Sequence, residues 1–532
     1  MSIEHGDAIG MPHQVTPGLP PAPWLQRVDH PRTVVVFLME AIWGPHHATG
    51  LEIARGHVDA GDEVHVVGCA TTLPSCAVNP RHQRFRCTLC HSALRRGLET
   101  LSLTDDRIHM LGEAPTDSLI PVPGSISELR QVETAGLPLG RGVASSLVSI
   151  LRESEPDLRQ HRDLVLALMR SAQLTTAETE RLLAQIRPDL VYVFNGRYAE
   201  SFPVVLLCQQ QGVPHWAHDL GYEPDTYRIA PGGTIHNLAY TKHVMQSLWE
   251  GSEHSDREQV GRSFFDGRRY GGTGDAVQRY RWAKHQERGI LPPAITDPAL
   301  RRRIGIFVSS EDELTALDDF RNPVYEHQLD AFRAIVDHEW DASTHLFVRS
   351  HPNLRGLDNT QTRLIRWAGS RDHTTVIPPE SDVDTYSLAE ACDVVVSFGS
   401  TVGIEAAHWG TPSVLVGRAV WEDLGVLRPS SHTEVIRLLK DPGPSRANAL
   451  PYGYMQRSWG LPFQHYSPWP DQDSDRGKSL VMPTRLAAAR SRVQRALDPS
   501  GGPVGRLTGM FGREGASHPA ADVRAPGRIS SD

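Results

Sequence analysis

Residues 349–353, which read RSHPN, combine side chains that can bind a phosphate. They follow an apolar run, so Arg349 and His351 stand where a predicted buried strand ends. An imidazole N–H can donate to a phosphate oxygen, and a guanidinium can fork onto it. Open α/β sheets bind ligands at the carboxyl ends of their strands, which predicts an anion-binding position here. The alternative is a histidine that caps a loop and an arginine that pairs with a surface carboxylate.

A second segment, residues 393–417, reads DVVVSFGSTVGIEAAHWGTPSVLVG. An apolar strand, a Gly/Ser/Thr turn, a short helix and a second strand form half of a parallel α/β unit. Ser400 and Thr401 stand at the start of that helix, where free backbone N–H groups bind phosphate readily. Glu405 lies one helical turn further and can point at the same ligand. An anionic donor or cofactor, such as a nucleotide, is the natural ligand, although Glu405 could also be a helix-surface carboxylate.

Ser309 and Ser310 end the first strand of the same series, in the run RIGIFVSSEDE. Their position predicts side chains at the same edge of the sheet as His351. The other interpretation is a helix cap, with the following acidic residues complementing the helix dipole.

The N-terminal half has its own strand-end residues. Asp219 follows a strand and precedes a glycine, so it is placed to act as a general base. His46 and His47 are predicted in the loop after the first strand and are the competing bases, although tandem loop histidines are most often only solvated. Asn195 and Arg197 position a substrate or fix a turn through backbone hydrogen bonds. The candidates on this side are His46, His47, Asn195, Arg197, His218 and Asp219.

Cysteines crowd between positions 69 and 90. The chain has six, at positions 69, 76, 87, 90, 208 and 392. Cys76, Cys87 and Cys90, the last two spaced as CxxC, have suitable types for a structural zinc ion in a small knuckle. Reduced, buried or redox-pairing thiols are the alternative, and an iron–sulfur cluster a remoter one. Cys208 and Cys392 are predicted to be core residues.

Strands alternate with helices along most of the chain, which is typical of parallel sheets. Strands are predicted at residues 33–39, 63–67, 189–194, 303–309, 345–348, 374–377, 394–396 and 413–416. The segment 101–187 is predicted to be mostly helical. The predicted units are a disordered tail at 1–30, a first domain at 31–285 with a Cys-rich insertion at 69–97, a second domain at 296–440, a crossover segment at 441–497 with a helix at 483–497, and a disordered tail at 498–532.

Composition limits the classes of partner. The chain has 532 residues, 54 Lys plus Arg against 63 Asp plus Glu, and a net charge of −9. That balance argues against nucleic acid as the main partner. No apolar stretch approaches the roughly 20 residues needed to span a bilayer, and the N-terminus lacks a secretory pattern. We expect a cytoplasmic protein, and peripheral membrane association stays open.

The motifs together resemble one family. RSHPN and SFGSTVGIEAAHWGTP look like the C-terminal half of GT-B glycosyltransferases that build bacterial surface polysaccharides. VYVFNGRYAE and HWAHDLGYEPDTY resemble the matching N-terminal stretch of capsule-biosynthesis proteins, and IFVSSEDE and PYGYMQRSWG are similar to further landmarks of that group. The resemblance spans residues from about 33 to 465. It implies two Rossmann-like domains facing a cleft, an acceptor-side one and a donor-binding one.

The resemblance also implies roles for the site residues. His351, Ser400 and Thr401 would hold the donor phosphates, and Glu405 would bind its ribose. Asp219 would deprotonate the acceptor, although this chain reads Asp-Leu-Gly where relatives usually show Glu-Arg-Gly. The implied reaction transfers a sugar from a nucleotide-sugar donor to a saccharide acceptor, with no catalytic metal or cofactor. The alternatives are a nucleotide-sugar epimerase, a polyol-phosphate transferase and a non-catalytic partner protein.

Overall fold

The computed structural model describes residues 19, 21–26, 28–112, 122–270, 286–313 and 315–468. The tail predicted at 498–532, the helix predicted at 483–497 and most of the tail predicted at 1–30 lie outside the described residues. Within the described residues, no helix is both long enough and apolar enough to cross a membrane.

The first half of the chain forms a sheet with the strand order β12-β6-β5-β4-β1-β2-β3. The ladder from β5 to β3 is parallel, and β6 and β12 add antiparallel neighbours at one edge. Its strands are β1 (Thr33–Leu38), β2 (Glu63–Cys69), β3 (Ile108–Leu111), β4 (Leu190–Phe194), β5 (His215–Leu220), β6 (Thr226–Pro231) and β12 (Leu461–Pro462). Its helices are α1 (Gly44–Asp59), α2 (Arg84–Leu101), α3 (Ile126–Arg130), α4 (Gly140–Leu151), α5 (Arg162–Ile186), α6 (Phe202–Gln211), α7 (Leu238–Glu250) and α8 (His254–Tyr270).

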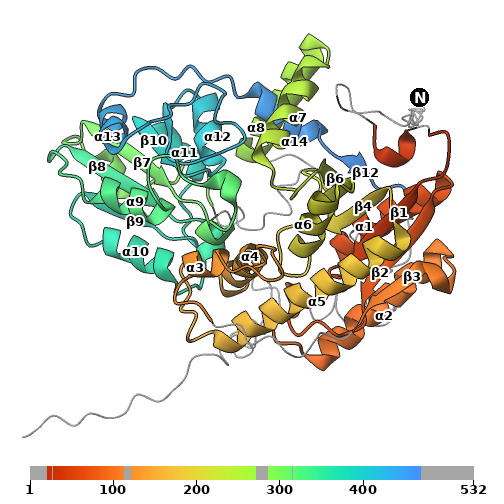
Figure 1. The fold of residues 1–532 in the computed structure, drawn as a ribbon. Helices are drawn as coiled ribbons and strands as arrows, with labels where there is room; N and C mark the ends of the chain where they lie inside the picture. The colour runs from red at the N-terminus through yellow and green to blue at the C-terminus, as the bar shows by residue number, and fades with distance from the viewer. Residues whose placement is uncertain are drawn as a thin grey trace, which may run out of the picture.

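The second half forms an all-parallel sheet with the order β11-β10-β7-β8-β9. Its strands are β7 (Arg302–Phe307), β8 (Thr344–Arg349), β9 (Thr374–Ile377), β10 (Val394–Ser397) and β11 (Ser413–Leu415). The helices that follow are α9 (Gln328–Val336), α10 (Thr360–Ala368), α11 (Thr385–Ala391), α12 (Val402–His408), α13 (His432–Lys440) and α14 (Leu450–Ser458). Two α/β halves with parallel sheets confirm the predicted fold class (Figure 1).

Continuous apolar runs explain the parallel strands. Val34 to Leu38 are all buried in β1, as are all residues of β10. Strands of a parallel sheet are covered by helices on both faces, so they need apolar side chains on both sides rather than in alternation. The same runs therefore identify the strands in the sequence and build the two cores.

Two sequence predictions in the first half are wrong, and a third missed a short strand. His46 and His47 lie in the first turn of α1, because that helix begins at Gly44 rather than after the histidines. The stretch predicted as a Cys-rich insertion contains α2, the ordinary crossover helix between β2 and β3. The segment predicted as mostly helical does hold α3, α4 and α5, and it also contains β3, a strand of four residues that is too short to show a clear period.

The chain returns to its first half after α13. In Figure 1, α14 lies against α8 and α7 between the two sheets, and β12 then pairs with β6. Residues of all three helices share one core, which includes Phe265, Tyr454 and Trp459. Beyond β12, the Glu52 carboxylate of α1 accepts backbone hydrogen bonds from Gln464, His465 and Tyr466. The two halves are therefore joined by packing as well as by the chain.

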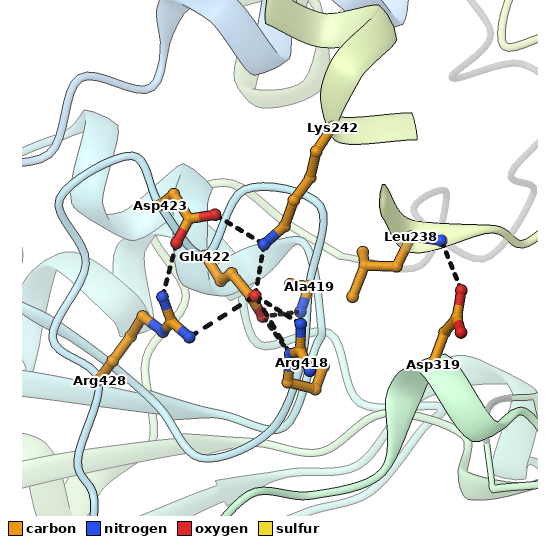
Figure 2. Close-up of polar contacts among 8 residues, drawn as sticks. All are labelled: Leu238, Lys242, Asp319, Arg418, Ala419, Glu422, Asp423 and Arg428. Carbon is orange, nitrogen blue, oxygen red and sulfur yellow. Dashed lines mark hydrogen bonds and ion pairs between the residues drawn. The ribbon is translucent and has the colours of Figure 1, made fainter. Parts of the chain in front are cut away.

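A polar network adds a second connection between the halves. Figure 2 shows Lys242, from α7, in contact with the carboxylates of Glu422 and Asp423, which follow β11. Arg418 Nε donates to Glu422 Oε2 at 2.8 Å, and Arg428 Nη1 donates to Asp423 Oδ1 at 2.6 Å. Burial alone would raise the pKa of Glu422, but hydrogen bonds from Arg418 and Lys242 outweigh burial and lower it to about 2. Glu422 is therefore a buried, fully paired carboxylate.

Replacing Glu422 by Gln should destabilise the protein by roughly 2 kcal/mol, because the buried carboxylate loses its charged hydrogen bonds to Lys242 and Arg418, which are themselves partly exposed. The pKa of Glu422 is depressed in the folded state, so its ionised form stabilises the fold above the ordinary glutamate pKa, and that stabilisation is lost as the pH falls toward about 2. The difference in stability between wild type and Glu422→Gln should therefore shrink as the pH falls from about 4.5. Urea unfolding at several pH values measures it. Asp423→Asn, at an exposed carboxylate, is the control and should cost under about 1 kcal/mol. Equal effects of the two substitutions would contradict the assignment.

Candidate active site

One small pocket gathers most of the predicted donor-binding residues. It has a volume of about 90 Å³ and lies at the carboxyl ends of β7, β8 and β10. Arg349, His351, Ser400, Thr401 and Glu405 all line it. These residues stand far apart in the sequence, and the parallel order of the strands brings them to one edge.

His351 is a neutral imidazole in this pocket. Burial lowers its pKa to about 4. Its Nδ1 accepts a hydrogen bond from the backbone N–H of Asn353 at 3.2 Å. An imidazole that accepts through Nδ1 carries its proton on Nε2, so His351 has an N–H with which to donate to a ligand. It is also the N-cap of the 3₁₀ turn Pro352–Leu354, which fixes the ring.

Arg349 supplies positive charge but is not free to move. Burial lowers its pKa to about 10, which leaves the guanidinium protonated at neutral pH. Its Nη1 donates to the carbonyl of Pro378 at 3.2 Å and its Nη2 to that of Ser381 at 3.4 Å. These bonds hold Arg349 against the loop after β9 while it lines the pocket.

Ser400 and Thr401 precede α12 directly, in the turn that follows β10. Gly399 has a φ of +113°, a conformation that favours glycine and lets the chain reverse between the strand and the helix. The carbonyls of Ser400 and Thr401 accept the first helical hydrogen bonds, from Gly403 and Glu405. The side chains of Ser400 and Thr401 are half-buried in the pocket wall, beside the N–H groups of the first helical turn.

Glu405 is bound by a residue that the sequence did not predict. Arg268, from α8 of the first half, places its Nε 2.7 Å from Glu405 Oε1, and Glu405 is 1% exposed. Burial alone would lower the pKa of Arg268, but Glu405 and Tyr386 raise it overall. Arg268 Nη2 also donates to Thr401 Oγ1 at 3.4 Å. The pocket therefore includes a cation from the other half of the chain, and no motif spacing in the sequence could reveal this crossing.

Ser309 and Ser310 do not line this pocket. They face a neighbouring cavity of about 690 Å³, across the end of β7. Ser310 bonds to Asp312, and Arg152, at the end of α4, donates to Asp312 at 2.5 Å and to Ser310 Oγ at 3.2 Å. The strand-end position of both serines was predicted correctly, but the two halves meet here and divide the edge into separate spaces.

On the N-terminal side, Asp219 and His46 form a pair. His46 Nδ1 lies 3.4 Å from Asp219 Oδ1, and Asn195 Nδ2 donates to Asp219 Oδ2 at 3.0 Å. Asn195 has a φ of +57° at the end of β4, which turns its amide toward β5. His236, which the sequence analysis missed, lies 3.3 Å from the same amide nitrogen. His46 is in α1, Asn195 follows β4 and Asp219 is in β5, so the fold assembles them.

The pKa values of this pair make Asp219 a weaker base than expected for a catalytic carboxylate. Burial alone would raise the pKa of Asp219, but His46, Arg228 and His236 lower it overall. Burial lowers the pKa of His46, although Asp219 opposes that effect. At neutral pH the pair is a weakly basic carboxylate beside a neutral imidazole. The imidazole is the group that can take a proton.

Three residues predicted on the acceptor side do not lie at the His46–Asp219 pair. His47 is buried against Gly97 of α2, and burial lowers its pKa to about 4. His218 is buried near Gly50 of α1, because its side chain points to the opposite face of β5 from Asp219. Burial lowers the pKa of His218 to about 3. Both are core histidines. Arg197 donates to Ser145 and Ser149 of α4 at 3.1 Å and so holds that helix.

The cysteines surround a small cavity but do not form the predicted zinc knuckle. Cys87 and Cys90 lie on the regular helix α2, and Cys69 and Cys76 line the same cavity. No three His, Cys, Asp or Glu side chains of the described residues are placed to hold a metal ion. Burial raises the pKa of Cys76 and Cys87, and that of Cys90 to about 12, so these cysteines are neutral thiols in the metal-free protein. The structure thus gives no support to the zinc site.

The carboxyl edges of the two sheets face each other. Besides the Arg152–Asp312 pair, the backbone N–H of Leu238 donates to Asp319 at 2.8 Å (Figure 2). Arg197 lies near enough to Glu313 to oppose the rise that burial causes in its pKa. The donor-side pocket and the His46–Asp219 pair therefore belong to facing edges.

Comparison with known proteins agrees with the motifs. Residues 323–442 match the family model described as capsule polysaccharide biosynthesis protein. No curated protein matches the chain. The solved structures it resembles include the beta Kdo 2,4 transferase and the beta Kdo 2,7 transferase of Thermosulfurimonas dismutans KpsC, and a putative UDP-N-acetylglucosamine 2-epimerase from Listeria monocytogenes.

The identities to these structures are 12%, 14% and 12%, in the same order, and the TM-scores are 0.31, 0.32 and 0.25. The similarities cover 51%, 53% and 84% of this chain and 79%, 80% and 99% of the other chains. Because these similarities are low, the interpretation of the C-terminal motifs is compared with the family match alone. The match covers residues 323–442, the segment that holds the RSHPN and SFGST motifs.

Proposed function

We propose that this protein is a glycosyltransferase that moves a sugar from a nucleotide-sugar donor to a saccharide acceptor in surface polysaccharide biosynthesis. The observation that carries the proposal is the pocket in which His351, Ser400 and Thr401 meet the cations Arg268 and Arg349. His351, Ser400, Thr401 and Arg349 lie within the segment that matches the capsule family. The location is cytoplasmic in this proposal, where nucleotide sugars are made available to the enzyme.

The pocket has the chemistry to bind the phosphates of a donor. A neutral His351 can donate a hydrogen bond through Nε2. The free N–H groups at the start of α12 also present partial positive charge to a phosphate. The guanidinium group of Arg349 supplies fixed positive charge, and that of Arg268, which is paired with Glu405, lies beside Thr401. Because these groups are already held in place, they can stabilise negative charge on the departing phosphate without reorganising. A catalytic metal is not needed in this scheme.

On the acceptor side, His46 is the better general base and Asp219 its positioning partner. A neutral imidazole can take the proton of an acceptor hydroxyl, and the carboxylate beside Nδ1 stabilises the imidazolium that forms. Asp219 alone is a poor base, since its neighbours lower its pKa. The role assigned to Asp219 from the sequence therefore moves to His46, while Asp219 keeps a part in the reaction.

A nucleotide should stabilise the protein against heat, and the effect should require His351. A ligand at a hundredfold excess over its Kd adds about 2.7 kcal/mol to the stability of the folded state. We expect one of CMP, CDP, UDP, GDP and ADP to raise the Tm, and His351→Ala to abolish the shift. His345→Ala, at a histidine of β8 that bonds to Thr375 outside the pocket, is the control and should keep the shift. If no nucleotide raises the Tm of wild type, the non-catalytic interpretation is favoured.

The pH dependence of transfer should identify the base. With His46 as base, kcat/KM falls on the acid side of a pKa below the ordinary histidine value of about 6.5. Asp219→Asn should reduce kcat/KM roughly 100-fold or more and move that limb to lower pH, because the carboxylate raises the pKa of His46. His46→Ala should remove the limb. His243→Ala, at an exposed histidine of α7, serves as the control. A limb that stays in place in Asp219→Asn would refute the pairing.

A further inference from the structure

A cavity of about 690 Å³ beside the donor pocket has no role in the proposed chemistry. It lies where α3 and α4 of the first half face the loop between β7 and α9 and the ends of β10 and β11. The donor pocket holds only about 90 Å³, so the space for a large ligand is in this cavity. Val308 lines the small pocket and the next residue, Ser309, lines the large one.

The arginines of the cavity are already paired with carboxylates. Arg130 and Arg321 both pair with Asp318, at 2.5 and 3.1 Å. Arg418 is held by the Glu422 carboxylate at 2.8 Å. A phosphate or carboxylate would have to displace these partners, so the cavity does not select for an anion.

Glu311 adds a neutral carboxyl group rather than a negative charge. It is 5% exposed, and its Oε2 accepts a hydrogen bond from Ser154 Oγ of the other half at 2.8 Å. Burial raises its pKa to about 8, with Glu155 and Glu153 adding to the effect. A protonated carboxyl can both donate and accept, which suits a hydroxyl group better than it suits a cation.

Ser309 provides the second polar contact. It is 8% exposed, and its Oγ has no hydrogen-bond partner among the described residues. A buried hydroxyl without a partner costs free energy, so a ligand that bonds to it gains that energy back. Gln328 contacts the Ser309 backbone at 3.3 and 3.5 Å, which are long bonds that a ligand hydroxyl could replace. Apolar side chains such as Val148 and Phe320 complete the wall.

We propose that this cavity binds an uncharged, hydroxyl-rich ligand, namely the saccharide chain of the acceptor. Its donors and acceptors match hydroxyl groups, and its apolar wall matches the C–H faces of a sugar ring. The cavity is linked to the donor side, because Arg152 bonds to Ser310 and also to the carbonyl of Asn353, two residues after His351. The identification of the ligand as the acceptor rests on the proposed function, whereas its chemical class rests on the cavity.

Saturation-transfer NMR with neutral disaccharides (maltose, lactose, cellobiose and chitobiose) and with N-acetylneuraminic acid as an anionic sugar tests the proposal. We expect at least one neutral disaccharide to bind the full chain. Ser309→Ala, which removes the hydroxyl and adds no volume, should weaken that binding about tenfold. Ser127→Trp, at an exposed residue of α3 on the cavity wall, should block it. Ser263→Trp, at an exposed residue of α8, is the matched control and should bind normally.

Nucleotide stabilisation separates this proposal from the preceding one. Both cavity variants should keep the Tm shift given by the nucleotide, because neither residue lines the donor pocket. Loss of disaccharide binding with an intact nucleotide shift supports the cavity as the saccharide site. Unchanged disaccharide binding in both variants, binding of N-acetylneuraminic acid alone, or no neutral disaccharide bound by wild type would overturn it. Absence of a nucleotide shift in wild type would count against the donor site and not against the cavity.

Discussion

The buried ion pair between Arg268 and Glu405 connects the fold to the site. Its two atoms are 2.7 Å apart, and Glu405 is almost fully buried. Breaking a buried pair leaves an uncompensated charge that costs several kcal/mol, so α8 of the first half must stay on α12 of the second. This constraint also sets the position of α14, which packs on α8 and leads the chain back to β12. The pair further places a guanidinium beside Thr401, so one interaction both holds the halves together and supplies charge to the donor pocket.

An apolar core shared by α7, α8, α12 and α14 also joins the halves. The other polar contacts between them lie close to the spaces that a substrate would fill. Arg152 with Asp312, Arg130 with Asp318 and Lys242 with Glu422 each join a helix of the first half to a loop at the carboxyl edge of the second sheet. Apolar contacts alone would not fix the relative orientation of the two halves, because the hydrophobic effect is non-directional. Charged pairs fix the register of the two edges, and the space between them is divided into a small pocket, lined by Arg268 and Arg349, and a larger cavity.

Burial decides the protonation states around the site. His351, His46 and His236 are neutral because desolvation lowers their pKa values, and Glu311 is neutral because desolvation raises its pKa. Asp219 stays ionised since imidazoles and a guanidinium surround it. Neutral donors near the donor pocket and a neutral base paired with a carboxylate are what a transfer between two polar substrates requires at neutral pH.

The sequence sufficed to locate eight of the twelve strands of the described residues, the parallel architecture and the C-terminal motif residues, but not β3, β5, β6 or β12. Continuous apolar runs specify buried parallel strands, and the residues that follow a strand must lie at its carboxyl end, so His351, Ser400 and Thr401 could be located from local pattern. Tertiary structure alone decided which strand-end residues share a space. It separated Ser309 and Ser310 from the donor pocket, buried His47 and His218 in the core, added Arg268 and His236, and placed Cys87 and Cys90 on a helix. Those outcomes depend on how the halves meet and on which face of an element turns inward, and neither is encoded in the spacing of a single motif.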